Sequence, residues 1–159
     1  MDDKQIVGIA DMKLARGAGM LITYALGSCI GICLYDPRLK LAALVHIMLP
    51  LNMEAGRKTP YKYADTGIRE ALREMERQGA VRSRVVAKIA GGAKMFEIGG
   101  GSLGNIGQRN IDSVRLILKR EGVRLAAEDV GGTAARTLLF DPATGQGCIR
   151  SYGKPERIF

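Results

Sequence analysis

Two apolar runs joined by an Asp-Pro turn constrain the fold of this chain more than any other feature. Ser28–Tyr35 and Lys40–Met48 are both of strand length and are separated by Asp-Pro-Arg-Leu at 36–39. Proline at the second position of a turn fixes φ, and aspartate at the first bonds its own backbone. The segment therefore predicts a β-hairpin with a four-residue loop, in which Tyr35 faces Lys40.

The rest of the chain combines strand-like runs with two helical segments. Strands are expected at Gln5–Ile9, Leu21–Tyr24, Val85–Ala90 and Val123–Val130, and a second Asp-Pro hairpin joins Thr137–Asp141 to Gln146–Tyr152. One helix is expected from Pro60 to Gln78, with Thr59 as N-cap and Gly79 ending it. A second is expected to begin at Asn110 as N-cap and to end at Gly122.

Each predicted helix has one apolar face. The buried positions are expected to be Ala64, Ile68, Ala71, Leu72 and Met75 in the first helix, and Ile111, Val114, Ile117 and Leu118 in the second. Arg69, Arg73 and Arg77 follow the outer face of the first helix beside Glu70, Glu74 and Glu76, which indicates a solvated, ion-paired surface. Two helices among many strands predict an α/β (α+β) fold of layered mixed sheets flanked by helices, with 1–159 as one domain.

Composition limits the classes of function that this chain can serve. The 159 residues are enough for one core, and charges or glycines interrupt every apolar run before it could cross a bilayer. The start Met-Asp-Asp-Lys lacks the pattern of a signal peptide, so we expect a cytoplasmic protein. A net charge of +8 favours acidic partners. Aromatic residues make up only 5% and the basic residues are dispersed, which argues against nucleic acid.

Cysteine and histidine form the main chemical candidate. In the predicted hairpin register Cys29 lies directly opposite His46, the only histidine, and opposed Cβ atoms are ~4.5–5.5 Å apart. An imidazole at this distance can take the proton of a thiol nucleophile. Gly27 and Ser28 would allow a tight turn whose N–H groups hold an oxyanion, and the Thr23 hydroxyl would orient the ring. The alternative is a buried cysteine beside a satisfied core histidine.

The other candidate sites are weaker. Cys33 and Cys148 are expected to be core residues, and three cysteines without a Cys-x-x-Cys pair favour reduced thiols over a disulfide framework or a metal site. The run 99–104 matches Gly-x-Gly-x-x-Gly, but no helix follows it directly, so we interpret it as a loop. Gly91 and Gly92 are expected to serve a close turn.

Several segments together resemble the chemoreceptor glutamine deamidase (CheD) family of bacterial chemotaxis. They are spread over most of the chain and occur at 26–36 (Leu-Gly-Ser-Cys-Ile-Gly-Ile-Cys-Leu-Tyr-Asp), 46–50 (His-Ile-Met-Leu-Pro), 63–66 with Ile68, 88–95 (Lys-Ile-Ala-Gly-Gly-Ala-Lys-Met) and 106–110 (Ile-Gly-Gln-Arg-Asn).

The resemblance implies a fold, a site and partners. The fold would be like that of the catalytic domain of cytotoxic necrotizing factor, with Cys29, His46 and Thr23 as catalytic residues. The reaction would hydrolyse glutamine side chains to glutamate on methyl-accepting chemotaxis receptors, without metal or cofactor, and methylester hydrolysis is also attributed to the family. The partners would be receptor helices and a CheC-type phosphatase. A non-enzymatic regulator of that phosphatase is the alternative function.

Overall fold

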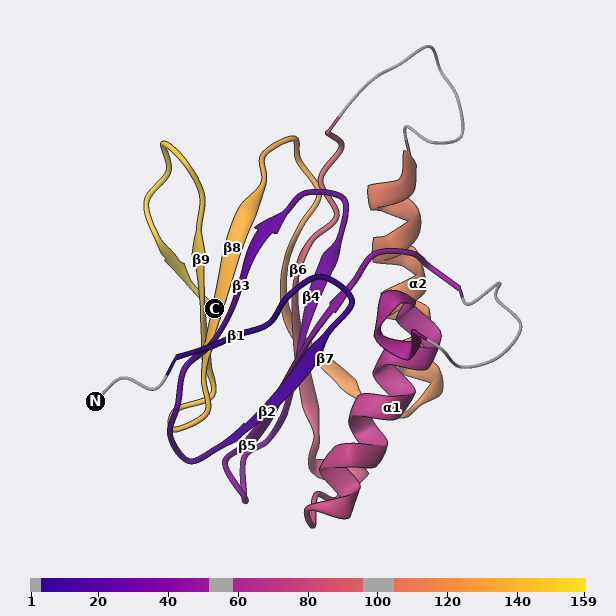
Figure 1. Ribbon diagram of the computed structural model, residues 1–159, viewed down its shortest axis with the longest axis vertical. Coiled ribbons are helices and arrows are strands. Elements are labelled where there is room, and N and C mark those ends of the chain that lie inside the picture. The colour runs from indigo at the N-terminus through magenta and orange to yellow at the C-terminus, as the bar shows by residue number, and fades with distance from the viewer. Residues whose placement is uncertain (1–3, 52–58, 96–104) are drawn as a thin grey trace.

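The fold has three layers, made of two β-sheets and a pair of helices (Figure 1). The structure is a computed structural model, and it describes residues 4–51, 59–95 and 105–159. Within these ranges the first sheet has the strand order β1-β3-β8-β9-β10 and the second the order β2-β5-β4-β6-β7. Both sheets are mixed, because β1 runs parallel to β3 and β6 parallel to β7, while the other neighbours are antiparallel. The predicted layered α+β class is confirmed.

The strands of the first sheet come from both ends of the chain. They are β1 (Gln5–Ile6), β3 (Leu21–Leu26), β8 (Arg136–Asp141), β9 (Gln146–Arg150) and β10 (Arg157–Ile158). The second sheet contains β2 (Met12–Arg16), β4 (Ile30–Asp36), β5 (Leu41–Ile47), β6 (Val86–Gly91) and β7 (Arg124–Val130). Both predicted Asp-Pro hairpins are present, as β4–β5 and β8–β9. The strands β2 and β10 were not predicted.

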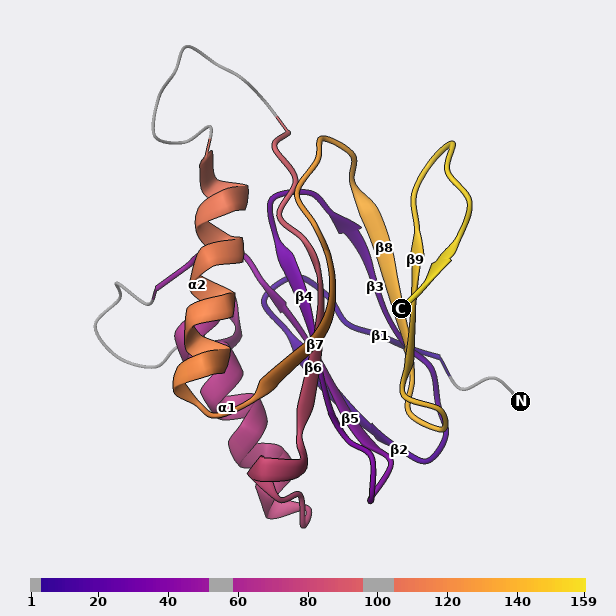
Figure 2. The ribbon, with the colours of Figure 1, turned by 180° about the vertical axis from the view of Figure 1, so that it is seen from behind.

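The second sheet is the middle layer. Helices α1 (Ala64–Arg77) and α2 (Ile106–Arg120) cover one of its faces, and the first sheet covers the other (Figures 1 and 2). Along β5, Ala43 and Val45 pack toward the helices, whereas Ala42 and Leu44 pack toward the first sheet. A strand buried on both faces needs apolar residues at nearly every position, which explains the uninterrupted apolar runs. None of the helices described here is long and apolar enough to span a bilayer.

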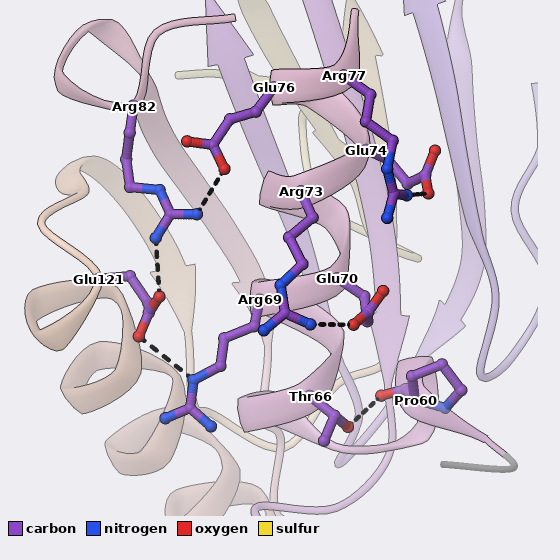
Figure 3. Close-up of polar contacts among 10 residues, drawn as sticks. All are labelled: Pro60, Thr66, Arg69, Glu70, Arg73, Glu74, Glu76, Arg77, Arg82 and Glu121. Carbon is purple, nitrogen blue, oxygen red and sulfur yellow. Dashed lines mark hydrogen bonds and ion pairs between the residues drawn. The ribbon is translucent and has the colours of Figure 1, made fainter.

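The helices use the apolar faces that the sequence predicts. All nine expected positions are buried. On the outer face of α1, Arg73 pairs with Glu70 and Arg77 with Glu74, while Arg69 and Arg82 share Glu121 (Figure 3). Exposed ion pairs contribute only about 0–1 kcal/mol each, so the apolar face is the main source of stability in α1.

Both predicted helix starts are wrong. Pro60 begins a separate 3-10 turn, Pro60–Lys62, and Thr59 makes no side-chain capping hydrogen bond; α1 begins only after Tyr63. In α2 the N-cap is Asn105, and Asn110 is fully buried inside the helix. Asparagine is typical of helix caps, but here tertiary contacts determine its place. The predicted ends hold, since Gly79 and Gly122 follow the helices with φ of 100° and 73°.

The hairpin register differs from the prediction by two residues. Tyr35 pairs with Ala42 and not with Lys40, and Asp36 pairs with Leu41, so the loop is 37–40, and Lys40 adopts a φ of 53°. The residue opposite His46 is therefore Gly31 and not Cys29. A shift of one residue would move every side chain to the other face, but a shift of two preserves the faces.

The remaining cysteine and glycine predictions had mixed outcomes. Cys33 is a buried core residue, as expected. Cys148 is not, because its half-buried thiol lies 3.5 Å from a carboxylate oxygen of Glu156. Gly91 and Gly92 both have positive φ at the end of β6, where no turn is assigned; Gly91 instead allows a close approach to the Cys29 backbone. The glycine run 99–104 lies outside the described residues.

Candidate active site

His46 connects the two sheets through its side chain. It lies on the same face of β5 as Ala42 and Leu44, and its Nδ1 is 2.7 Å from Oγ1 of Thr23 on β3. The same hydroxyl donates to the carbonyl of Val7 at 2.8 Å. A hydroxyl has one hydrogen, and a carbonyl can only accept. Thr23 must therefore accept from Nδ1–H of His46, which leaves the lone pair of the imidazole on Nε2.

Gly31 provides the space for this connection. A Cβ at Gly31 would lie 2.9 Å from Cδ2 of Leu138 and 3.3 Å from Cγ2 of Thr23. A side chain there would force Leu138 of the first sheet, or its neighbours Leu26 and Thr23, to shift beside the imidazole. The glycine opposite His46 thus lets a residue of the middle sheet reach β3.

The protein environment keeps His46 neutral. The residue is only 1% exposed, and burial lowers the pKa of its imidazole to about 4. Its Nε2 is buried and has no hydrogen-bond partner among the described residues. A neutral ring with a fixed tautomer and a vacant acceptor nitrogen has the properties of a general base.

Cys29 lies in the turn between β3 and β4. Its thiol is half-buried. Burial raises the pKa of the thiol, and the backbone N–H of Cys29 lowers this pKa by a smaller amount. The resting pair is therefore a neutral thiol and a neutral imidazole. Cys29 directly precedes β4, is two residues from Gly31, which pairs with His46, and packs against the apolar cluster between the two sheets. No hydrogen bond joins the thiol to Nε2 in the described structure, and such contacts often tighten only when substrate binds.

The Cys29 turn, residues 27–29, is held against the end of β6. The N–H of Ala93 donates to the Gly27 carbonyl at 2.7 Å, and that of Gly92 to the Cys29 carbonyl at 2.9 Å. A Cβ at Gly91 would be 2.1 Å from the Cys29 oxygen, so only glycine allows this close approach. The turn is therefore a rigid platform for the thiol.

The turn leaves two backbone donors available. The N–H of Gly27 donates to the Ala25 carbonyl at 3.0 Å, so this group is engaged within the turn. Among the described residues, no backbone carbonyl accepts from the N–H of Ser28 or Cys29. Ala25 itself has a φ of 57° within a register shift of β3 between Thr23 and Leu26. This strained irregularity separates Thr23 from the turn.

Comparison with known proteins identifies the family. A family model described as CheD chemotactic sensory transduction matches residues 48–151. A protein of Syntrophomonas wolfei named probable chemoreceptor glutamine deamidase CheD is 49% identical over 154 residues, which is 96% of each chain. This chain belongs to the CheD family. The chemoreceptor glutamine deamidase CheD of Thermotoga maritima is 41% identical over 157 residues, covering 98% of this chain and 96% of the relative. Both alignments extend beyond the family-model match, over nearly the whole chain.

Proposed function

We propose that this protein hydrolyses glutamine side chains to glutamate on methyl-accepting chemotaxis receptors. Cys29 is the nucleophile, His46 the general base and acid, and Thr23 the residue that orients the imidazole. The observation that carries the proposal is the Thr23–His46 hydrogen bond, which leaves Nε2 of a neutral ring as a base. The names of the relatives supply the substrate class.

The first half of the reaction forms a thioester. Because the resting thiol and imidazole are both neutral, Nε2 of His46 takes the thiol proton as sulfur attacks the glutamine Cδ. The carbonyl oxygen becomes an oxyanion that accepts from the N–H groups of Ser28 and Cys29. The oxyanion then collapses, the C–N bond breaks, and the imidazolium gives its proton to the departing ammonia.

The second half returns the enzyme to its resting state. A water molecule attacks the thioester carbon while His46 takes one of its protons. The C–S bond breaks, the imidazolium returns this proton to the Cys29 sulfur, and the glutamate side chain is released. The sequence of steps uses no metal ion and no organic cofactor. The same geometry applies to an ester carbonyl, so hydrolysis of receptor methylesters follows the same route.

The proposed partners follow from the substrate. Receptor adaptation helices rich in glutamate would be attracted to a chain with a net charge of +8. A CheC-type phosphatase that imitates a receptor helix would compete for the same site. With these proposed partners, the proposed location is the cytoplasm.

A direct assay tests the proposal. The protein is incubated with a receptor cytoplasmic fragment, and glutamine-to-glutamate conversion is measured by mass spectrometry of its peptides. Wild type should convert specific glutamines, and Cys29→Ala and His46→Ala should not. Cys148→Ala is the matched control, because this half-buried thiol lies on β9 and should be dispensable.

The assay also separates the alternative function. A non-enzymatic regulator of the phosphatase would leave every receptor glutamine unchanged, and its cellular effect would survive Cys29→Ala. Unchanged receptor peptides in the presence of wild-type protein would therefore overturn the enzymatic proposal.

A further inference from the structure

Asn110 makes contacts that no part of the proposed mechanism has used. Its side-chain nitrogen Nδ2 lies 2.9 Å from the carbonyl oxygen of Ser28 and 2.9 Å from that of Met48. The residue is fully buried in α2, and its Oδ1 has no hydrogen-bond partner among the described residues. One amide thus joins the Cys29 turn to the chain just after β5, which carries His46.

The orientation of this amide is unambiguous. Carbonyl oxygens can only accept, so both contacts require the NH₂ group and use both of its hydrogens. A flipped amide would place Oδ1 against two carbonyls.

The Ser28 carbonyl belongs to the same peptide group as the Cys29 N–H. A trans peptide is planar, and its C=O and N–H point in opposite directions; the described residues contain no cis peptide. Holding the Ser28 oxygen on the α2 side therefore directs the Cys29 N–H to the opposite side.

Asn110 completes a set of three anchors. The carbonyls of Gly27 and Cys29 are held by the backbone N–H groups of Ala93 and Gly92, and the carbonyl between them is held by a side chain. Of the three anchors, this is the one made by a side chain, so it can be removed by a substitution that leaves the backbone donors in place. Hydrogen bonding to a carbonyl also polarises its peptide, which strengthens the N–H as a donor.

We propose that Asn110 is a positioning residue that fixes and polarises the Cys29 N–H as an oxyanion donor. The inference rests on the proposed function, because the oxyanion arises only in amide or ester hydrolysis. Asn110 does not touch the substrate; it acts through the Ser28–Cys29 peptide group.

The test compares two reactions of the same sulfur. Deamidation builds an oxyanion, whereas alkylation of Cys29 by iodoacetamide displaces iodide and builds none at the turn. Asn110→Ala should lower kcat for deamidation about 10–100-fold, since loss of a whole oxyanion donor costs ~10²–10³-fold. Its KM and its alkylation rate should stay within about twofold of wild type. Asn110→Asp keeps the volume but cannot donate to both carbonyls, so it should show the same split.

Control variants separate this role from general packing. Gln108→Ala removes an exposed amide of α2 that donates to Asp112, and it should match wild type. Val114→Ala removes buried volume from the same helix, and it should lower the melting temperature without lowering kcat selectively. Equal selective losses of kcat in Val114→Ala and Asn110→Ala would refute the positioning role.

The remaining outcomes are also decisive. Asn110 variants that deamidate at the wild-type rate would overturn the inference and leave the proposed function intact. Parallel loss of deamidation and alkylation would show that Asn110 holds the whole turn instead of one donor, and would overturn it as well. A wild-type protein without any deamidation would overturn the proposed function, and the inference with it.

Discussion

Replacing Thr23 by valine tests the arrangement of the candidate site most directly. Valine has nearly the same shape, so the change removes the hydroxyl without opening a cavity. It leaves His46 Nδ1–H and the Val7 carbonyl without their partner, at 2.7 and 2.8 Å from the former oxygen. Each unsatisfied buried group costs about 1–3 kcal/mol, so the free energy of unfolding should fall by about 2–6 kcal/mol.

The effect on activity should be distinct from this loss of stability. Without an acceptor at Nδ1, the tautomer that presents a lone pair on Nε2 loses about 1–1.5 kcal/mol of support. Further loss comes from freer rotation of the ring. At 1.36 kcal/mol for each factor of ten, kcat/KM for deamidation should fall about 5–30-fold.

Thr23→Ser is the matched control for this prediction. Serine keeps the hydroxyl and loses only the methyl that packs near Gly31. Its kcat/KM should stay within about threefold of wild type, although its stability falls by about 1 kcal/mol. The assay is receptor-fragment deamidation at a temperature where circular dichroism shows all variants folded. A valine variant with the kcat/KM of wild type would refute the role of the hydroxyl in orienting His46.

Three further predictions concern stability. Gly31→Ala should lower the free energy of unfolding by about 1–3 kcal/mol in urea titrations, because its Cβ would lie 2.9 Å from Leu138; unchanged stability would mean that the sheets separate easily. As the pH falls from 6.5 to about 4, the unfolded chain binds a proton at His46 that the folded protein does not, so stability should fall by up to about 3 kcal/mol. His46→Gln should lack that component of the pH dependence, and an identical profile would contradict a buried neutral ring. Asp36→Asn should lower the free energy of unfolding by about 2–3 kcal/mol, because this fully buried carboxylate loses its ion pair with Arg84. Burial alone would raise the pKa of Asp36, but hydrogen bonds, among them that from Arg84, lower it overall. A double-mutant cycle with Arg84→Ala should show coupling between the two residues.

Much of the middle sheet and its helices could be predicted from the sequence, because apolar patterns report burial. The two-residue error in register arose because an Asp-Pro turn is compatible with either loop, 36–39 or 37–40. The error did not affect which face His46 uses. Thr23 was expected near the imidazole, and the structure joins them by a hydrogen bond.

Other features depend on contacts that no local pattern encodes. Asn110 is a residue type typical of helix caps, but it lies inside α2, where its side chain donates to the carbonyls of Ser28 and Met48. Strand β2 is half-buried and carries Lys and Arg among its five residues, so it lacks a clear apolar run. The importance of Gly31 emerges only when Leu138 and Thr23 of the first sheet pack against it.

The bond between Thr23 and His46 has a consequence for how this protein fails under stress. His46 and Thr23, the proposed base and the residue proposed to orient it, belong to different layers, so slight loosening between the layers breaks their hydrogen bond while each sheet keeps its own ladder of hydrogen bonds. Inactivation on heating should thus begin before the chain as a whole melts. Loss of activity on heating would therefore report weakened packing between the two sheets.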